Sequence, residues 1–226
     1  MDVRSVIAIA LLSMLWIMIV LKVFPHRRKI NSQFITRTAI FAAMSIILYL
    51  VPYFNLALPI FPGFLKIHFD EVPAFIAGFA YGPLSAFFVI IIKTVAKLPM
   101  TITGGVGELA DLIYSIAFVI PAAFIYKKHR SIKGVLVAFS IATVIQLLVS
   151  CFVTSFAILK FYIFVMGWPE SVIVDACHAV NPAVTSLGWT FFFLVALPFN
   201  AFKDVMVVII TFLLYKRLHT YIDKLD

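Results

Sequence analysis

The feature that most constrains this chain is a series of long apolar runs separated by short basic clusters. The longest runs cover residues 6–24, 34–53, 107–126, 133–158 and 198–216. Each approaches the roughly 20 apolar residues that a helix needs to cross a bilayer. The runs are continuous and lack the apolar–polar alternation typical of membrane β-strands. The sequence therefore predicts an all-α polytopic membrane protein.

Composition and charge point the same way. The chain is 64% hydrophobic and 12% charged, whereas soluble domains average about 45–50% and about 25%. A net charge of +8 would suit nucleic acid, but the basic residues gather between or after the apolar runs, as in cytoplasmic loops. We therefore expect the lipid bilayer and no nucleic acid as a partner. The clusters are Arg27, Arg28, Lys29 and Arg37; Lys127, Lys128, Arg130 and Lys133; and Lys216, Arg217 and Lys224.

Placing the three basic clusters in the cytoplasm predicts the topology. The N-terminus then lies outside, the C-terminus is cytoplasmic, and two short segments around Gly82-Pro83 must both cross, namely 72–81 and 83–97. The outer segments are 54–69, 98–107 and 159–198. The apolar patch Leu187 to Leu197 inside the last of these remains open as a re-entrant helix, a short span or a cap.

The first run predicts a retained transmembrane helix. Residues 6–24 are followed by Pro25 without a small-x-small cleavage site, so a cleaved signal peptide is not favoured.

A polar, glycine-rich stretch lies between two apolar runs at residues 101–111. It contains Gly104, Gly105 and Gly107 together with two carboxylates. The stretch lacks the Gly-Lys-Ser/Thr of a P-loop, so no nucleotide hydrolysis is assigned to it. Its glycines are suited either to close approach of a ligand to the backbone or to a tight turn.

Unusual polar residues gather at the predicted outer side. They are Lys66, His68, Asp70, Glu71, Lys93, Lys97, Glu108, Asp111, Asn200, Lys203 and Asp204. Ionisable groups within a membrane are costly and usually face a cavity or each other. Residues three or four positions apart share a helix face. The pairs Lys93 and Lys97, Glu108 and Asp111, and Asn200 and Lys203 therefore define three faces, which are expected to converge on one pocket. The alternatives are snorkelling lysines, first-turn acids that complement a helix dipole, and polar contacts between helices.

The chain offers little support for catalysis or metal binding. Cys151 and Cys177 lack metal-ligand spacing, so neither a metal site nor a disulfide framework is expected. An integral membrane enzyme remains a remote alternative, which would require His178 to approach Glu108 and Asp111.

Three segments in order along the chain resemble a known family. They are Phe64 to Pro73 with the Gly82-Pro83 break, Gly104 to Asp111 followed by Phe118 to Ala122, and Pro198 to Asp204 leading to Leu214 to Leu218. Together they resemble the substrate-binding (S) component of energy-coupling factor (ECF) vitamin transporters, of the riboflavin-binding RibU type. The resemblance implies a six-helix bundle whose outer pocket is lidded by loop 55–69. Residues 1–33 would then be an extra N-terminal transmembrane helix with a basic linker, and 34–226 the S-component domain.

The resemblance also implies a function. The chain would take riboflavin, or FMN as a second candidate, from outside a bacterial cell. A transmembrane coupling subunit and two cytoplasmic ATPases would drive delivery inward, so the chain itself would not be an enzyme. Riboflavin would be its transported ligand and not a cofactor.

Site residues follow from the same resemblance. The ligand-binding positions are Leu65, Lys66, Glu108, Asp111, Ser150, Asn200 and Lys203. The small-residue face of Ala39 and Ala43, with Ala42 adjacent, would dock on the coupling subunit, although such faces also pack within a chain. The chain departs from the family pattern at His68, usually Asp, at Asp111, usually Asn, and at Ser150, which stands for a pocket asparagine. These departures leave open an S component for another vitamin or precursor.

Overall fold

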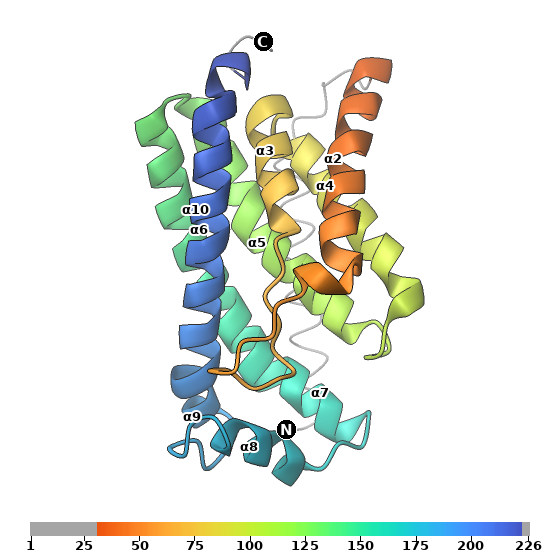
Figure 1. Cartoon of the computed structure of the whole chain (residues 1–226), viewed down its shortest axis with the longest axis vertical. Helices are drawn as coiled ribbons and strands as arrows, with labels where there is room; N and C mark the ends of the chain where they lie inside the picture. The colour runs from red at the N-terminus through yellow and green to blue at the C-terminus, as the bar shows by residue number, and fades with distance from the viewer. Residues whose placement is uncertain (1–30, 223–226) are drawn as a thin grey trace.

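The computed structural model describes residues 31–222, with side chains to residue 219, as a bundle of helices along one axis (Figure 1). The predicted span 6–24 and the basic residues between it and residue 31 lie outside this part of the chain. The helices are α2 (Ser32–Leu50), α3 (Glu71–Tyr81), α4 (Pro83–Lys97), α5 (Val106–Lys128), α6 (Ile132–Val153), α7 (Leu159–Phe164), α8 (Glu170–His178), α9 (Trp189–Phe191) and α10 (Leu197–Ile222). Short 3₁₀ turns cover Pro52–Phe54 and Leu98–Met100, and π-helical turns cover Thr154–Ile158 and Phe192–Ala196.

Helix α3 forms the centre of the bundle. It contacts α2, α4, α5 and α10, and all its residues from Glu71 to Ala80 are buried. The ring of Phe75 lies 4.8 Å from that of Phe118. Neighbouring helices, and not lipid, thus cover α3, so its 11 residues need not match the thickness of the bilayer.

Local sequence explains where several helices begin. The side chains of Asn31 and Ser131 accept hydrogen bonds from the backbone N–H groups of Phe34 and Gly134, at 2.8 and 3.0 Å. Such caps satisfy N–H groups that a helix leaves unpaired. Pro83 occupies the first position of α4, where its missing N–H costs nothing.

Two predicted boundaries are wrong, and π-helical turns accompany both. The span predicted to end at residue 158 continues through Thr154–Ile158 into α7 and ends at Phe164. The last helix begins at Trp189 and not at Pro198. Proline lacks an N–H for the preceding turn, and the wider π-turn Phe192–Ala196 lies just before Pro198. Residues 189–197 of the apolar patch are therefore the start of the last helix, which is none of the three predicted alternatives.

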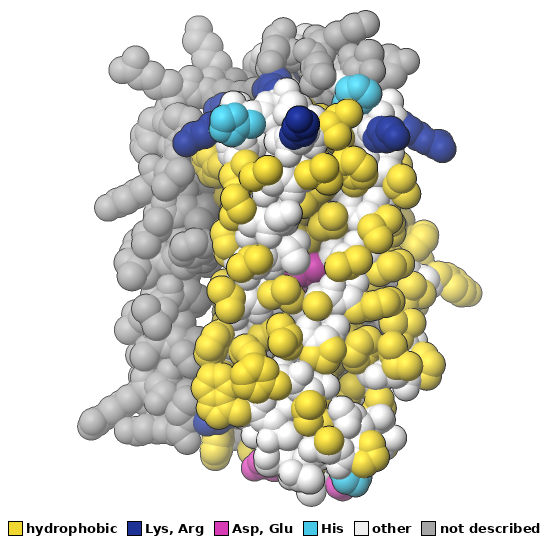
Figure 2. Space-filling model, turned by 90° about the vertical axis from the view of Figure 1, so that its left-hand side faces the viewer, with side chains coloured by type: hydrophobic (Ala, Val, Ile, Leu, Met, Phe, Trp, Pro, Cys, Tyr) yellow, Lys and Arg dark blue, Asp and Glu magenta, His cyan; other side chains and the backbone are white. Residues whose placement is uncertain are grey.

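The two ends of the bundle differ in character. Helices α5 and α10 end at the upper end in Figure 1, while α8 lies at the lower end and loop 51–69 in the lower half. Figure 2 shows lysine and arginine side chains gathered at the upper end above a broad hydrophobic surface. Five helical segments of the described chain are long and apolar enough to cross a membrane. The all-α, multi-span fold is confirmed, whereas the orientation of the termini stays a prediction.

Candidate ligand site

A buried ionic group connects the central helix to three of its neighbours. We use this name for Asp70, Glu71, Lys93, Asp111, Lys203 and Asp204, which come from the start of α3 and the residue before it, the second half of α4 and the first halves of α5 and α10.

Lys93 binds two carboxylates and a hydroxyl. Its ammonium group donates to Asp70, to Asp111 Oδ2 at 2.9 Å and to Ser115 Oγ at 2.8 Å. The side chains of Lys93 and Asp70 are fully buried. The two lysines expected on one face of α4 do share it, because the Nζ atoms of Lys93 and Lys97 both lie 5.1 Å from the ring centroid of Tyr49.

A second buried ion pair joins α10 to α3. Lys203 Nζ donates to Glu71 Oε1 at 2.6 Å, and the two side chains are 6% and 1% exposed. The neighbouring Asp204 is also buried. Neither of its carboxylate oxygens has a hydrogen-bond partner within the described part of the chain.

The buried ionic group holds more carboxylates than ammonium groups. Four acids face two lysines, and one oxygen each of Asp70 and Glu71 is also unpartnered among the described residues. Oxygens of Asp70, Glu71 and Asp111 lie within 4.8 Å of one another. The Lys93 ammonium, bound to two of these acids, supplies the positive charge that a metal ion would otherwise bring. Chemically, the group offers hydrogen-bond acceptors to a ligand.

Loop 55–69 crosses the lower half of the bundle (Figure 1). Its ends pair through Leu56 and Ile67, whose backbone groups exchange hydrogen bonds of 3.0 and 2.8 Å. On one side the ring of His68 packs edge-on against Tyr49 at 5.4 Å. On the other side Phe61 packs against Phe199 of α10 at 5.2 Å. The loop thus reaches from α2 to α10, as the predicted lid would.

His68 is held neutral in this loop. Its Nδ1–H donates to Asn55 Oδ1 at 2.7 Å. Burial lowers the pKa of the His68 imidazole to about 4. At neutral pH the loop therefore adds no positive charge through His68 to offset the surplus carboxylates.

The glycine-rich stretch forms a tight turn before α5. Gly104 and Gly105 adopt positive φ angles of 62° and 89°, a region that glycine enters without strain. The hydroxyls of Thr101 and Thr103 donate to Glu108 Oε2 at 2.7 and 3.1 Å. Glu108 is thus engaged with the turn, while Asp111 binds Lys93, so these two predicted site residues have separate partners.

The other predicted ligand positions lie apart from the ionic contacts. Ser150 Oγ donates to Gln146 Oε1 at 2.9 Å, and Asn200 Nδ2 donates to the carbonyl of Ala196 at 2.8 Å. Leu65 packs against an apolar cluster formed mainly by α7, α8, α9 and the π-turn that follows them, and Lys66 is exposed. Asn200 approaches Cys151 Sγ at 4.0 Å, which brings α10 close to α6. The role of these residues in binding stays a prediction.

The predicted docking alanines point in different directions. Ala39 and Ala43 are exposed on α2, beside the exposed side chains of Ile40 and Met44. Ala42 is buried in the main core. Packing inside the chain therefore accounts for Ala42, while Ala39 and Ala43 face outward and remain candidates for a partner.

Sequence reasoning missed part of the site. Asp70, Glu71 and Lys93 stood out as unusual polar residues but were not among the predicted ligand positions. Ser115 lies four residues after Asp111 on the same face of α5, a spacing that could have revealed it. Tyr49 gave no signal, because an aromatic residue near the end of a membrane span is usual.

Comparison with known proteins identifies the family. The family described as "ECF transporter, substrate-specific component" matches residues 33–215. The chain belongs to this family. The match starts close to the predicted boundary between residues 33 and 34, although the division into two parts itself stays a prediction.

Named relatives and a solved structure agree with this assignment. Riboflavin transporter RibU of Staphylococcus aureus (strain TCH60) is 26% identical over 88% of this chain and 98% of its own length. Riboflavin transporter FmnP of Bacillus subtilis (strain 168) is 29% identical over 84% of this chain and 95% of its own. The solved S component of a bacterial ECF transporter aligns with a TM-score of 0.64 at 22% identity, covering 84% of this chain and 96% of that one. The S-component fold is thereby confirmed.

The enzyme alternative finds no support in this family or in the geometry. His178 lies in α8, where its Nδ1–H donates to the carbonyl of Val184 at 3.2 Å. Glu108 and Asp111 bind threonine hydroxyls and Lys93 respectively. The family is that of the substrate-specific part of a transporter.

Proposed function

We propose that this chain captures riboflavin from outside the cell as the S component of an ECF importer. The observation that carries the proposal is the match to two proteins named riboflavin transporters over 98% and 95% of their own lengths. A match of that extent covers nearly the whole length of both relatives.

The orientation of the proposed importer follows from charge. The basic ends of α5 and α10 lie in the cytoplasm, the C-terminus lies with them, and the N-terminus lies outside the bacterial membrane. Loop 55–69 and the buried ionic group then belong to the outer half. The exposed Ala39 and Ala43 dock on a transmembrane coupling subunit, and two cytoplasmic ATPases provide the energy.

The site is chemically suited to the flavin. The isoalloxazine ring packs on apolar and aromatic side chains, while a few polar groups fix its orientation. Riboflavin carries ribityl hydroxyls and an imide N–H, and the surplus carboxylates accept hydrogen bonds from such donors. Asn200 and Lys203 satisfy the polar edge of the ring, and loop 55–69 excludes water. Because FMN adds an anionic phosphate, the same carboxylates favour riboflavin over FMN.

A second candidate is an S component for another vitamin or precursor. The surplus of buried carboxylates over lysines favours it, since a ligand with a basic group would neutralise that charge. Mass spectrometry of small molecules that co-purify with the protein separates the two candidates.

Uptake into membrane vesicles tests the proposed transport. Vesicles that contain this chain, a coupling subunit and the two ATPases are expected to accumulate riboflavin only when ATP is supplied. Vesicles without the ATPases are the control. ATP-independent accumulation would contradict the coupling, and a preference for FMN over riboflavin would contradict the charge argument.

A further inference from the structure

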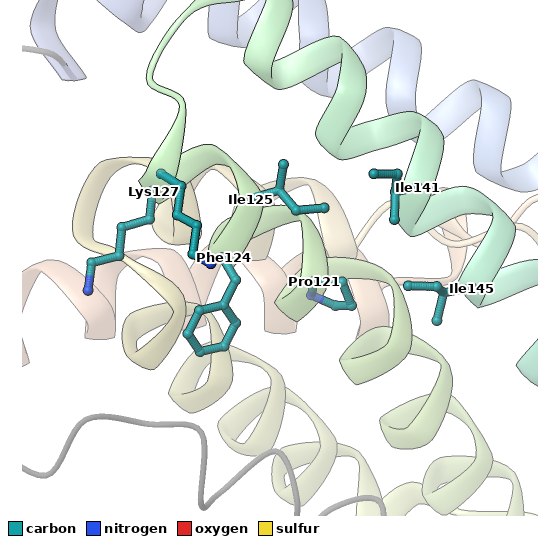
Figure 3. Close-up of a pocket in the computed structure, with 7 residues that line it drawn as sticks. Pro121, Phe124, Ile125, Lys127, Ile141 and Ile145 are labelled. Atoms are coloured by element: carbon teal, nitrogen blue, oxygen red, sulfur yellow. The ribbon is translucent and has the colours of Figure 1, made fainter.

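A groove on the opposite half of the bundle is unrelated to the buried ionic group. It has a volume of about 700 Å³ and lies between α5 and α6 (Figure 3). Its walls include Pro121, Ile125, Ile141 and Ile145. Asp111 lies ten residues before Pro121 on α5, about 15 Å along a helix axis, so the groove is separate from the candidate ligand site.

The groove combines an apolar floor with a basic end. Lys127 and Lys128, the last residues of α5, line it together with the apolar residues. Both lysines are exposed, and Ile141 is 44% exposed. An exposed isoleucine on a candidate membrane span faces the hydrocarbon, so the groove opens toward lipid and its lysines lie where the helix leaves the membrane.

This arrangement matches one kind of molecule. An acyl chain fits an apolar channel between two spans, and a phosphate group fits two ammonium groups at its end. Basic pockets between transmembrane helices on the cytoplasmic side bind anionic head groups in this way. A vitamin fits less well, because the apolar walls offer few groups to orient it.

We propose that this groove between α5 and α6 holds an anionic phospholipid, with its head group on Lys127 and Lys128 and an acyl chain along Ile141 and Ile145. The lipid lies in the cytoplasmic leaflet and adds to the packing of α5 against α6. This inference depends on the proposed membrane orientation but not on the identity of the transported vitamin.

Native mass spectrometry of the full-length protein tests the proposal. The protein is mixed with equal amounts of phosphatidylglycerol and phosphatidylcholine, and the retained lipid is counted. Wild type is expected to prefer phosphatidylglycerol. Lys127→Gln with Lys128→Gln should weaken that preference about 30-fold, since each lysine near an anionic surface contributes about fivefold.

Two further variants sharpen the test. Lys216→Gln with Arg217→Gln removes the same charge from the end of α10 and should leave the preference unchanged. Ile141→Trp fills the groove and should reduce retention of both lipids, while ligand binding at the outer site persists. Equal retention of the two lipids by wild type would overturn the proposal, and so would an equal loss in the Lys216/Arg217 variant. Retention that appears only after residues 1–30 are removed would show that this segment, and not lipid, occupies the groove.

Discussion

The Lys203–Glu71 pair is a residue-level contact whose loss should be measurable. It is buried and joins two residues that are 132 positions apart in sequence. Removing one partner of such a pair leaves an uncompensated charge in the interior, which costs about 3–5 kcal/mol. Lys203 therefore has a structural role whether or not it also contacts a ligand.

Replacing Lys203 alone should thus destabilise the protein. Lys203→Met is expected to lower the free energy of unfolding in detergent by about 3 kcal/mol, because Glu71 is left charged and unpaired. Adding Glu71→Gln should recover most of the loss. Lys66→Met is the matched control on an exposed lysine and should change stability by less than about 0.5 kcal/mol. If the double variant is no more stable than Lys203→Met, the pairing is not what stabilises this contact.

The buried His68 predicts a dependence on acid. Its pKa in the folded chain, about 4, lies below the ordinary value of 6.5, so protonation favours states in which the loop is open or unfolded. Stability is complete above pH 6.5 and falls as the pH drops toward 4. The thermal midpoint of wild type should fall more between pH 7 and pH 5 than that of His68→Gln. Equal falls in the two proteins would show that another group is responsible.

The sequence revealed the residue types of the site better than their partners. Ionisable residues near one end of a membrane bundle must face each other, so the convergence of Lys93, Asp111 and Lys203 near α3 was predictable. The pairings were not, because spacing places Glu108 and Asp111 on one face but cannot show that Thr101 and Thr103 engage Glu108.

The close turn between α5 and α6 leaves no room for a side chain at Gly134. A Cβ atom at Gly134 would lie 1.8 Å from the backbone oxygen of His129, and backbone cannot move aside cheaply. Gly63 has no atom within 4 Å of the same position. Gly134 therefore tests the packing of α5 against α6, and Gly63, in loop 55–69, is the control.

Gly134→Ala should destabilise the bundle, and Gly63→Ala should not. The expected loss for Gly134→Ala is about 1–3 kcal/mol, the cost of overpacking a core. Chemical unfolding in detergent measures both variants. An unchanged stability of Gly134→Ala would mean that the α5–α6 turn does not have the described geometry.

Element boundaries were predictable where capping residues or proline mark them. Asn31, Ser131 and Pro83 stand at or next to helix starts that the sequence indicated closely. Pro198 misled for a physical reason. Proline often opens a helix, but here a π-turn precedes it and the helix continues through it.

At the scale of the whole molecule, α2 has one exposed face and one face buried in the core. A bulky residue at Ala43 should spare vitamin binding and abolish co-purification of the coupling subunit, because Ala43 is exposed. The same change at Ala42 should destabilise the protein itself, because that side chain is 2% exposed and packs in the core. Co-purification of the coupling subunit with Ala43→Trp at the wild-type level would argue against this docking face.

The overall fold was predictable because long apolar runs indicate membrane-spanning helices without knowledge of side-chain contacts. The central position of α3 was harder to foresee, since 11 residues are short for a span and the burial of Glu71 to Ala80 depends on contacts with neighbouring helices.

Direct binding of riboflavin by the purified, full-length protein tests the central claim most directly. Flavin fluorescence is followed while protein is added, because stacking against aromatic side chains quenches it. We predict saturable quenching at or below micromolar concentrations, together with a yellow ligand that co-purifies with the protein. The absence of both flavin and quenching at micromolar concentrations, from protein that remains folded, would contradict the account.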